Sequence, residues 1–429
     1  YEQRQNTHAK GLPRTYANSV VATGALPLVT RCASREWARD ARRAFLRWAR
    51  HADYLRGLSL GQQLHLGCRQ LFVAGEYLLV RRYAAQGDVR LRYLMIRPDR
   101  LRSPERAPND ARVTNGVEVD ADGRPAAYWI LPEDPDNGIS ALLQPPQRVP
   151  ASQVVHVFYA EDPVQHRGEP WLAQSLPIYH RLRRYDDATV AAATIAAKFA
   201  AVLVNLQPDA VADVEKWLPP GVVDLWDGQL YVPPAGYEPR QITPQHPSTN
   251  ASEFRRDQLA TAGAGVAMPK NIATQDSSGS SFASARFDGV SFAQDGEVVR
   301  GLIEDLHLDR VWEDWLTEAV AVGLLPPPPP HEVRWLWPQE DRHTDPNKRE
   351  SANDARVRGG RASIQKLAME DGEDGEEILE ELFAEIDEFR ERNLRHPFDA
   401  GAAPAPTADR GPTDADDKAD DEADENDAD

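Results

Sequence analysis

The sequence predicts an α+β fold in which a small mixed domain precedes a series of long helices. Three observations support this prediction. Short β-type runs separated by turn residues lie between positions 76 and 159, a stretch without glycine runs from Trp171 to Val204, and the C-terminal end is dominated by acidic residues.

Length and composition restrict the class of protein. The chain of 429 residues is long enough for two or three packed units. It contains no apolar run approaching the roughly 18 residues that a membrane span needs, so no membrane partner is expected. Its two cysteines, Cys32 and Cys68, exclude a disulfide framework and a cysteine-based zinc site, and a reducing cytoplasm is the expected compartment.

The net charge of −19 is concentrated at one end of the chain. Residues 370–391 carry a net charge of −11 and residues 399–429 a net charge of −10, whereas residues 1–369 are neutral. Residues 396–429 consist largely of Ala, Pro and acids, which cannot bury a core. We therefore expect this tail to be disordered.

The N-terminal domain begins with helices and continues with strands. Ser34 caps a predicted helix over 34–56, with apolar residues at helical spacing and arginines on its other faces. These arginines fit either a DNA-binding face or a solvated face paired with acidic neighbours. A second helix is expected over 59–74. Strands are expected over 76–83, 89–96, 116–119, 126–131 and 154–159, with a hairpin turn from Asp120 to Gly123.

Long helices are expected after the first domain, which ends at residue 168. The Ala-rich stretch 169–206 suits packing either against copies of itself or within one chain. Residues 207–247 are rich in Pro and Gly, and Asn250 with Glu253 forms a capping box for a second helix over 248–266. The two helices predict a hairpin whose tip protrudes.

The remaining segments alternate between loops and helices. Residues 269–281 are polar and Ser-rich, which predicts a mobile loop. A helix over 283–322 follows, with Gly289 and Gly296 as the expected positions of a break. The part of this helix that carries Trp312 and Trp315, together with the Ala-rich helix over 171–204, is expected to bury surface between subunits. Five prolines, a strand over 333–337 and helices over 346–369 and 374–394 complete the prediction.

A search for catalytic signatures gives a negative result. The chain has no Walker A loop, GxGxxG turn, HExxH helix or GxSxG elbow. Its 11 His residues are scattered, and Asp186 and Asp187 point to different faces of a helix. We therefore expect no enzyme activity, no cofactor and no metal site, and the pattern favours a structural role.

The order of these segments resembles the lambda-like family of phage portal proteins, up to about residue 395. The most specific stretches are Val149 to Phe158, which is similar to "VPA-x-x-V-I-H-x-F", and Arg167 to Ala173, which is similar to "RG-x-PWLAP". Weaker similarities are found at 17–29, Gly75-Glu76, Asn115 to Tyr128, Gly265 to Pro269, Ser281 to Arg286 and Asp345 to Glu350. The residues matched to family motifs include Arg167, Gly168, Pro170, Trp171, Arg286, Asp345, Pro346 and Lys348.

The resemblance implies a portal fold and a portal function. Such a protein forms a ring, usually of 12 subunits, at one capsid vertex, where double-stranded DNA enters and leaves without sequence-specific recognition. Its implied partners are the large terminase subunit, the major capsid and scaffolding proteins and the head–tail adaptor, with assembly in the host cytoplasm. The implied parts are a wing (1–168), stem helices (169–206 and 248–266), a clip (207–247), a tunnel loop (267–283), a tunnel helix with spacer and wing strand (284–345), a crown (346–395) and the acidic tail (396–429).

Two sets of candidate contact residues follow from this assignment. A channel for sliding DNA needs weak phosphate contacts, which the short polar side chains of the tunnel loop supply. Lys270 is the only cation of residues 269–281, and Asp276 places a repulsive charge beside it. The candidate DNA contacts are Lys270, Asn271, Thr274, Gln275, Ser277, Ser278, Ser280 and Ser281. The candidate terminase or adaptor contacts in the clip are Trp217, Asp224, Trp226, Asp227 and Tyr231.

Two other interpretations stay open from the sequence. The first is a DNA-processing enzyme of the packaging machinery, such as a nuclease or motor subunit, which needs a phosphate loop or an acid cluster. The second is a different head or connector protein without a channel.

Overall fold

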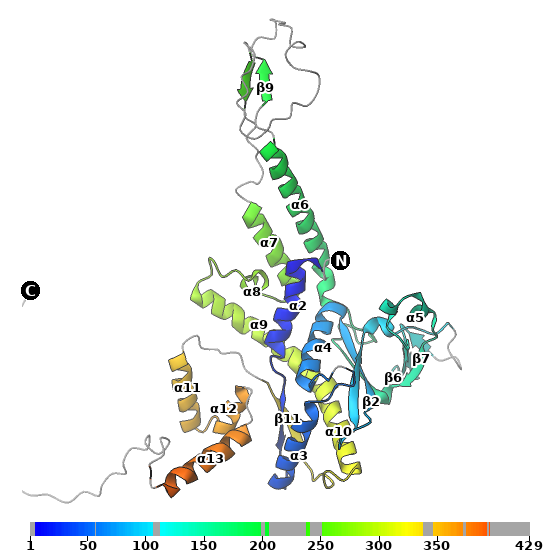
Figure 1. Cartoon of the computed structure of the whole chain (residues 1–429), viewed down its shortest axis with the longest axis vertical. Coiled ribbons are helices and arrows are strands. Elements are labelled where there is room, and N and C mark those ends of the chain that lie inside the picture. The colour runs from blue at the N-terminus through cyan, green and yellow to red at the C-terminus, as the bar shows by residue number, and fades with distance from the viewer. Residues whose placement is uncertain are drawn as a thin grey trace, which may run out of the picture. The chain divides into compact units, whose positions relative to one another are not determined.

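The computed structural model describes residues 5–55, 57–105, 112–198, 202–205, 237–240, 251–337, 346–371, 375–392 and 394 (Figure 1). The chain divides into two compact units, which are described separately. The first contains Tyr1–Ser351 and Met369–Gly372, and the second contains Ala352–Ala368 and Glu373–Asp429. Most of the predicted clip and the whole acidic tail lie outside the described residues.

Three N-terminal helices build one side of the core of the first unit. They are α2 (Thr7–Val20), α3 (Arg35–Ala49) and α4 (Leu60–Ala74). The predicted cap at Ser34 is confirmed, because its side chain accepts a hydrogen bond from the amide of Trp37. Ser59 and Gln62 form a complete capping box at the start of α4. Helix α2 was not predicted, although Asn6 caps it and it buries one apolar face.

Two antiparallel sheets follow, and most of their strands match the predicted runs. The first has the order β3-β2-β8, with β2 (Glu76–Tyr83), β3 (Leu91–Ile96) and β8 (Val154–Phe158). The second has the order β4-β5-β6-β7, with β4 (Arg112–Thr114), β5 (Val117–Val119), β6 (Pro125–Ile130) and β7 (Gln147–Pro150). Successive residues of β2 enter two different cores, since Tyr77 packs with the helices and Leu78 packs against the second sheet.

A strand pair joins distant parts of the chain. Strand β1 (Leu26–Thr30) pairs antiparallel with β11 (Glu332–Leu336), so that Thr30 lies opposite Glu332. Trp335 of β11 packs near Phe45 of α3, with the ring centroids 5.9 Å apart. The expected strand near 333–337 is confirmed, whereas its pairing with β1 was not predicted.

The long helix before this strand contains an irregular turn. Helix α9 (Phe282–Ile303) continues through a π-helical turn (Glu304–Leu308) into α10 (Asp309–Ala321). The expected break at Gly289 or Gly296 is therefore wrong, because α9 runs through both glycines. The side chains of Trp312 and Trp315 lie in the core of the protomer, 4% and 0% exposed, so any surface that this helix buries between subunits must come from its other residues.

The Ala-rich segment forms one half of a helical hairpin. Helix α6 (Leu176–Lys198) begins after a 3₁₀ turn (Trp171–Gln174) and lies beside α7 (Ala251–Ala264), as Figure 1 shows. Short strands β9 (Val202–Asn205) and β10 (Tyr237–Arg240) pair beyond the helices. The two predicted helices on either side of residues 207–247 are thus confirmed, although α6 is shorter than expected.

The remaining elements are short or C-terminal. Helix α5 (Ile139–Leu143) precedes β7, and α8 (Lys270–Thr274) follows α7. Three further 3₁₀ turns cover Pro98–Arg100, Pro135–Asn137 and Ala151–Gln153. The predicted helix over 346–369 is two helices, α11 (Pro346–Arg358) and α12 (Ile364–Glu370), because the chain turns at Gly359 and Gly360. Helix α13 (Gly375–Glu391) completes the described elements.

Candidate functional site

The family-like motifs of the first unit meet at one buried carboxylate. Glu76 lies at the start of β2 and is 1% exposed. Its oxygens accept hydrogen bonds from His156 Nε2 at 2.9 Å, from Arg167 Nε at 2.6 Å and from the Gly168 amide at 2.8 Å. We call this set of four residues the motif junction.

Burial and neighbouring charges act in opposite directions on the pKa values of Glu76 and His156 at the motif junction. Burial alone would raise the pKa of Glu76, but the hydrogen bonds from His156 and Arg167 lower its pKa below the ordinary value. Burial lowers the pKa of His156, and the nearby carboxylate only partly opposes this effect. Glu76 is therefore ionised with Arg167 as its counter-ion, while neutral His156 donates a hydrogen bond to it.

Two glycines allow the two chain segments of the junction, one at the end of α4 and one before the 3₁₀ turn at Trp171, to approach each other. Gly75 ends α4 in the left-handed conformation, with a φ of 81°. A Cβ atom on Gly168 would overlap with the carbonyl oxygen of Gly75, and a Cβ atom on Gly75 would overlap with the backbone of Glu169. Gly75 and Gly168 therefore make one close backbone contact, and any residue type other than glycine at either position would prevent it.

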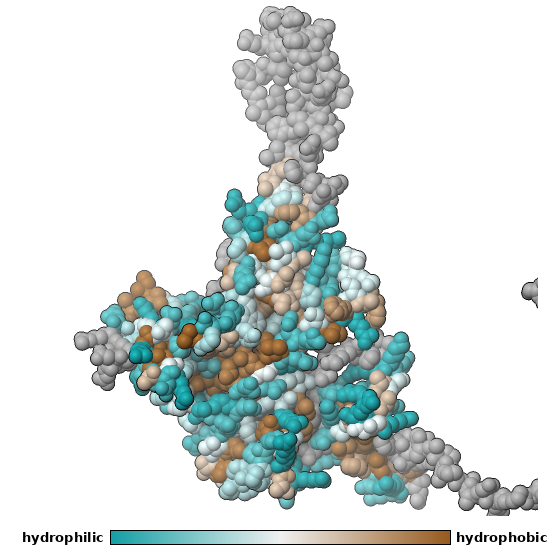
Figure 2. Space-filling model, turned by 180° about the vertical axis from the view of Figure 1, so that it is seen from behind, coloured by the Kyte–Doolittle hydropathy of each residue, from teal (hydrophilic) through white to brown (hydrophobic). Residues whose placement is uncertain are grey.

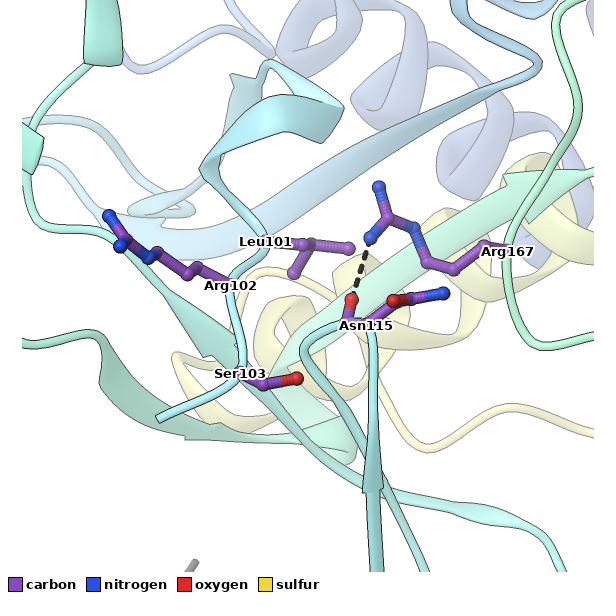
Figure 3. Close-up of a pocket in the computed structure, with 5 residues that line it drawn as sticks. All are labelled: Leu101, Arg102, Ser103, Asn115 and Arg167. Carbon is purple, nitrogen blue, oxygen red and sulfur yellow. Dashed lines mark hydrogen bonds between the residues drawn. The ribbon is translucent and has the colours of Figure 1, made fainter. Parts of the chain in front are cut away.

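Arg167 also joins the junction to the second sheet. Its guanidinium donates to the carbonyl oxygens of Asn115 at 2.6 Å and Pro98 at 3.0 Å. Arg167 and Asn115 line a hollow of about 530 Å³. Figure 3 shows Arg167 beside Asn115, while the side chain of Arg102 extends away from Arg167. Because the donors of Arg167 are used by the protein itself, we interpret this site as structural.

The motif residues after the junction anchor the α6–α7 hairpin. Trp171 packs edge-on against Tyr16 of α2 and Phe72 of α4, with ring centroids 5.6 and 6.2 Å apart. One turn later, Ser175 Oγ donates to the carbonyl oxygen of Ala262 in α7 at 2.7 Å. The base of the hairpin is therefore held by the core of the first unit.

The hairpin itself is held by fewer and more exposed contacts. Tyr185 packs against Phe254, with ring centroids 4.7 Å apart, and Asp186 accepts a hydrogen bond from Arg255 at 2.6 Å. Both side chains of this ion pair are more than one third exposed. Solvent screening makes such a pair worth at most about 1 kcal/mol.

The segment predicted as a loop is partly helical. Residues 270–274 form α8, which packs on α7 where Ala273 lies against Gly263. Of the candidate DNA contacts, Lys270, Asn271 and Thr274 belong to α8, and Gln275 ends it in the left-handed conformation. The prediction of a loop across 269–281 is therefore wrong for its first half.

Residues 275–281 are an exposed loop whose charges are paired. Asp276 lies 3.0 Å from Arg256 Nε of α7, so it is not the free repulsive charge that the sequence suggested. Hydrogen bonds from Ser278, followed by the nearby positive charges, lower the pKa of Asp276. Ser281 caps α9 through its hydrogen bond with the Ser284 amide at 3.2 Å. Ser277, Ser278 and Ser280 are exposed between them.

The other candidate residues are dispersed. Arg286 is exposed on α9, and Lys348 lies in α11, which begins at Pro346. Five clip residues and one motif residue lie outside the described part of the chain, namely Trp217, Asp224, Trp226, Asp227, Tyr231 and Asp345. Among the described residues no group of three or more His, Cys, Asp or Glu side chains could hold a metal ion. No described helix has both the length and the apolar character to cross a membrane.

Two features of these sites were not predicted from the sequence. The first is the pairing of Arg256 with Asp276, and the second is the central role of Glu76 in the core. The position of Glu76 at the first residue of an apolar strand was the available signal, because charged residues are rarely buried without partners.

The comparison with protein families decides the assignment. The chain matches the model described as phage portal protein, lambda family, over residues 2–300. The chain belongs to the lambda family of phage portal proteins. Its function is accordingly that of a portal, or head–tail connector, subunit of the ring channel at one capsid vertex of a phage particle.

Known proteins with similar sequences or structures include other components of phage-like particles. A probable portal protein of Halomonas phage phiHAP-1 is 25% identical over 362 residues, covering 77% of this chain and 68% of that protein. The neck of a native gene transfer agent particle, computed with C12 symmetry, has a TM-score of 0.48 at 14% identity, covering 87% of this chain and 92% of that chain. A HK97 family portal protein from Corynebacterium diphtheriae has a TM-score of 0.35 at 13% identity, covering 72% and 93% of the two chains.

Proposed function

We propose that twelve copies of this chain form the ring and that double-stranded DNA slides through its centre. The observation that supports this proposal most directly is the family match over residues 2–300. Assembly takes place in the host cytoplasm on the major capsid and scaffolding proteins, and the ring becomes part of the virion. No cofactor and no catalytic step are part of this proposal.

The α6–α7 hairpin is the proposed stem, and its tip is the proposed docking site for the large terminase subunit and the head–tail adaptor. Its base is fixed by Trp171 and Ser175, whereas only a few exposed contacts hold its helices. A hairpin anchored at one end carries β9 and β10 away from the core. The sequence between these two strands, residues 206–236, contains all five candidate clip residues.

The segment around α8 is the proposed contact with moving DNA. Lys270 Nζ lies 3.8 Å from Asp257 and its side chain is 58% exposed, while Arg256 is paired with Asp276. These near-neutral pairs leave little net positive charge, which favours sliding over tight phosphate binding. The exposed serines of 275–281 add weak hydrogen-bond contacts.

Imaging of the purified protein tests the ring and the channel. Rings with a central hole of about 20 Å or more are expected, since the duplex must pass. Protein that stays monomeric in the presence of scaffold and capsid protein would contradict the proposal. Lys270→Gln combined with removal of residues 275–280 should keep the rings and lower the amount of packaged DNA. Lost rings with normal packaging in the remaining particles would instead make this segment an assembly element.

A further inference from the structure

An open groove lies where the first turns of the hairpin approach the second half of α9. It has a volume of about 480 Å³, and Tyr159, Trp171 and Val298 contribute to its apolar lining. Tyr159 is 41% exposed and Val298 is 58% exposed. Figure 2 shows that apolar side chains also gather in patches on the face seen from behind. Such surfaces in a soluble chain mark contact sites.

Three carboxylates surround the apolar lining of this groove. Glu161, Glu169 and Asp295 line it, and all three are exposed. None of them forms an ion pair with another residue in the described part of the chain. The groove therefore repels DNA phosphates and fits an apolar segment that carries positive charge.

The first half of α9 carries a surface of the complementary kind. Phe282, Phe287 and Val290 are 68%, 74% and 48% exposed. Arg286 is exposed among them and has no hydrogen-bond or ion-pair partner in the described residues. We call these four residues the α9 patch. Its aromatic side chains and one unpaired guanidinium match the apolar lining and acidic rim of the groove.

The α9 patch cannot fill the groove of its own protomer. Phe287 and Val298 are eleven residues apart on one straight helix, which separates them by about 16 Å. A patch and a groove that lie on one chain but cannot meet there form a heterologous pair. Repetition of such a pair builds a ring when the rotation from one subunit to the next closes.

We propose that the α9 patch of each protomer docks in the groove of the next protomer, with Arg286 facing Asp295, Glu161 and Glu169. This inference rests on the proposed ring function and names the contact that builds the ring. The same contact explains the exposure of Phe287 and Val298 on a helix whose other face lies in the core.

Charge exchange across the contact tests the inference. Arg286→Glu should place like charges at every contact of the ring. Asp295→Arg combined with Glu161→Gln and Glu169→Gln, which makes the groove positive, should do the same from the opposite side. Each variant should need at least tenfold more protein for half-assembly, measured by analytical ultracentrifugation. A 1:1 mixture of the two variants should recover rings with an even number of subunits, because both alternating contacts then join opposite charges.

Matched variants distinguish a specific loss of this contact from misfolding and from a general loss of ring formation. Arg124→Glu, an equal charge reversal on the exposed β5–β6 turn, should leave assembly unchanged, and circular dichroism should show the same fold in all variants. Half-assembly of either variant at the wild-type protein concentration, or no recovery on mixing, would overturn the contact while the wild-type ring stands. A wild-type protein without rings would overturn the ring itself.

Discussion

The motif junction and the α9 patch use arginine in opposite ways. At the junction, Arg167 is three quarters buried and donates to a carboxylate and two carbonyl oxygens. In the α9 patch, Arg286 is exposed and has no partner within the described residues. An arginine whose three nitrogens all donate within the protein holds the fold, whereas an arginine without a partner is available to another molecule. This difference assigns stability to the first region and assembly to the second.

The largest expected effect comes from neutralising the junction. Glu76→Gln should destabilise the protein by about 3–5 kcal/mol, because Arg167 would remain partly buried without its counter-ion. Urea denaturation followed by circular dichroism measures this loss. The matched variant Asp186→Asn removes an exposed ion pair of the α6–α7 hairpin and should cost at most about 1 kcal/mol. If both variants lost the same amount of unfolding free energy, the buried ion pair at the junction would contribute no more to stability than the exposed pair of the hairpin.

The close backbone contact between Gly75 and Gly168 should not tolerate an added side chain. Gly168→Ala should cost about 3 kcal/mol or more, since its methyl group would overlap with the carbonyl oxygen of Gly75. The control is Gly289→Ala in α9, where nothing lies within 4 Å and the helix should gain up to about 1 kcal/mol. Thermal unfolding of both variants provides the measurement. A Gly168→Ala protein as stable as the wild type would contradict the close approach of Gly168 to Gly75.

Acid should weaken the core through His307. This side chain is fully buried beside Tyr77, and burial lowers its pKa to about 3. The unfolded state therefore binds more protons between about pH 6.5 and pH 3, so stability falls as the pH decreases through this window. His307→Gln cannot titrate and should show a smaller loss over the same range, while costing about 1–3 kcal/mol at pH 7. The measurement is the free energy of unfolding of both proteins at several pH values. If it falls equally steeply with decreasing pH in the wild type and in His307→Gln, His307 is not responsible.

The smallest expected effect is at the start of α9. Ser281→Ala removes the helix cap and should cost about 1 kcal/mol. The neighbouring Ser280→Ala, whose side chain caps no helix, should change stability by less than about 0.5 kcal/mol. The difference in urea midpoint between these two variants measures the cap alone.

Local signals in the sequence predicted local structure well. The cap at Ser34, the strand Glu76–Tyr83 and the turn before Gly123 all depend on neighbouring residues, and the structure confirms them. Helix α2 also carries a local signal, an apolar residue every third or fourth position after the cap at Asn6, so it too was within reach of a prediction.

Features that depend on distant residues were not predictable in the same way. The Arg256–Asp276 pair, the meeting of Gly75 with Gly168 and the acidic rim of the groove each join segments that folding alone brings together. Trp312 and Trp315 show the same limit, because their spacing predicted an apolar helix face without indicating which surface covers it.

The pairing of β1 with β11 affects how the chain is made. Thr30 and Glu332 are 302 residues apart, so at 5–20 residues per second the first strand waits about 15–60 s for its partner during translation. Until then β1 remains an open edge, and the core lacks Trp335 and Trp337. A polypeptide released early cannot complete this sheet. A chain that ends before residue 332 lacks one of the two strands of this sheet and two tryptophans of the core.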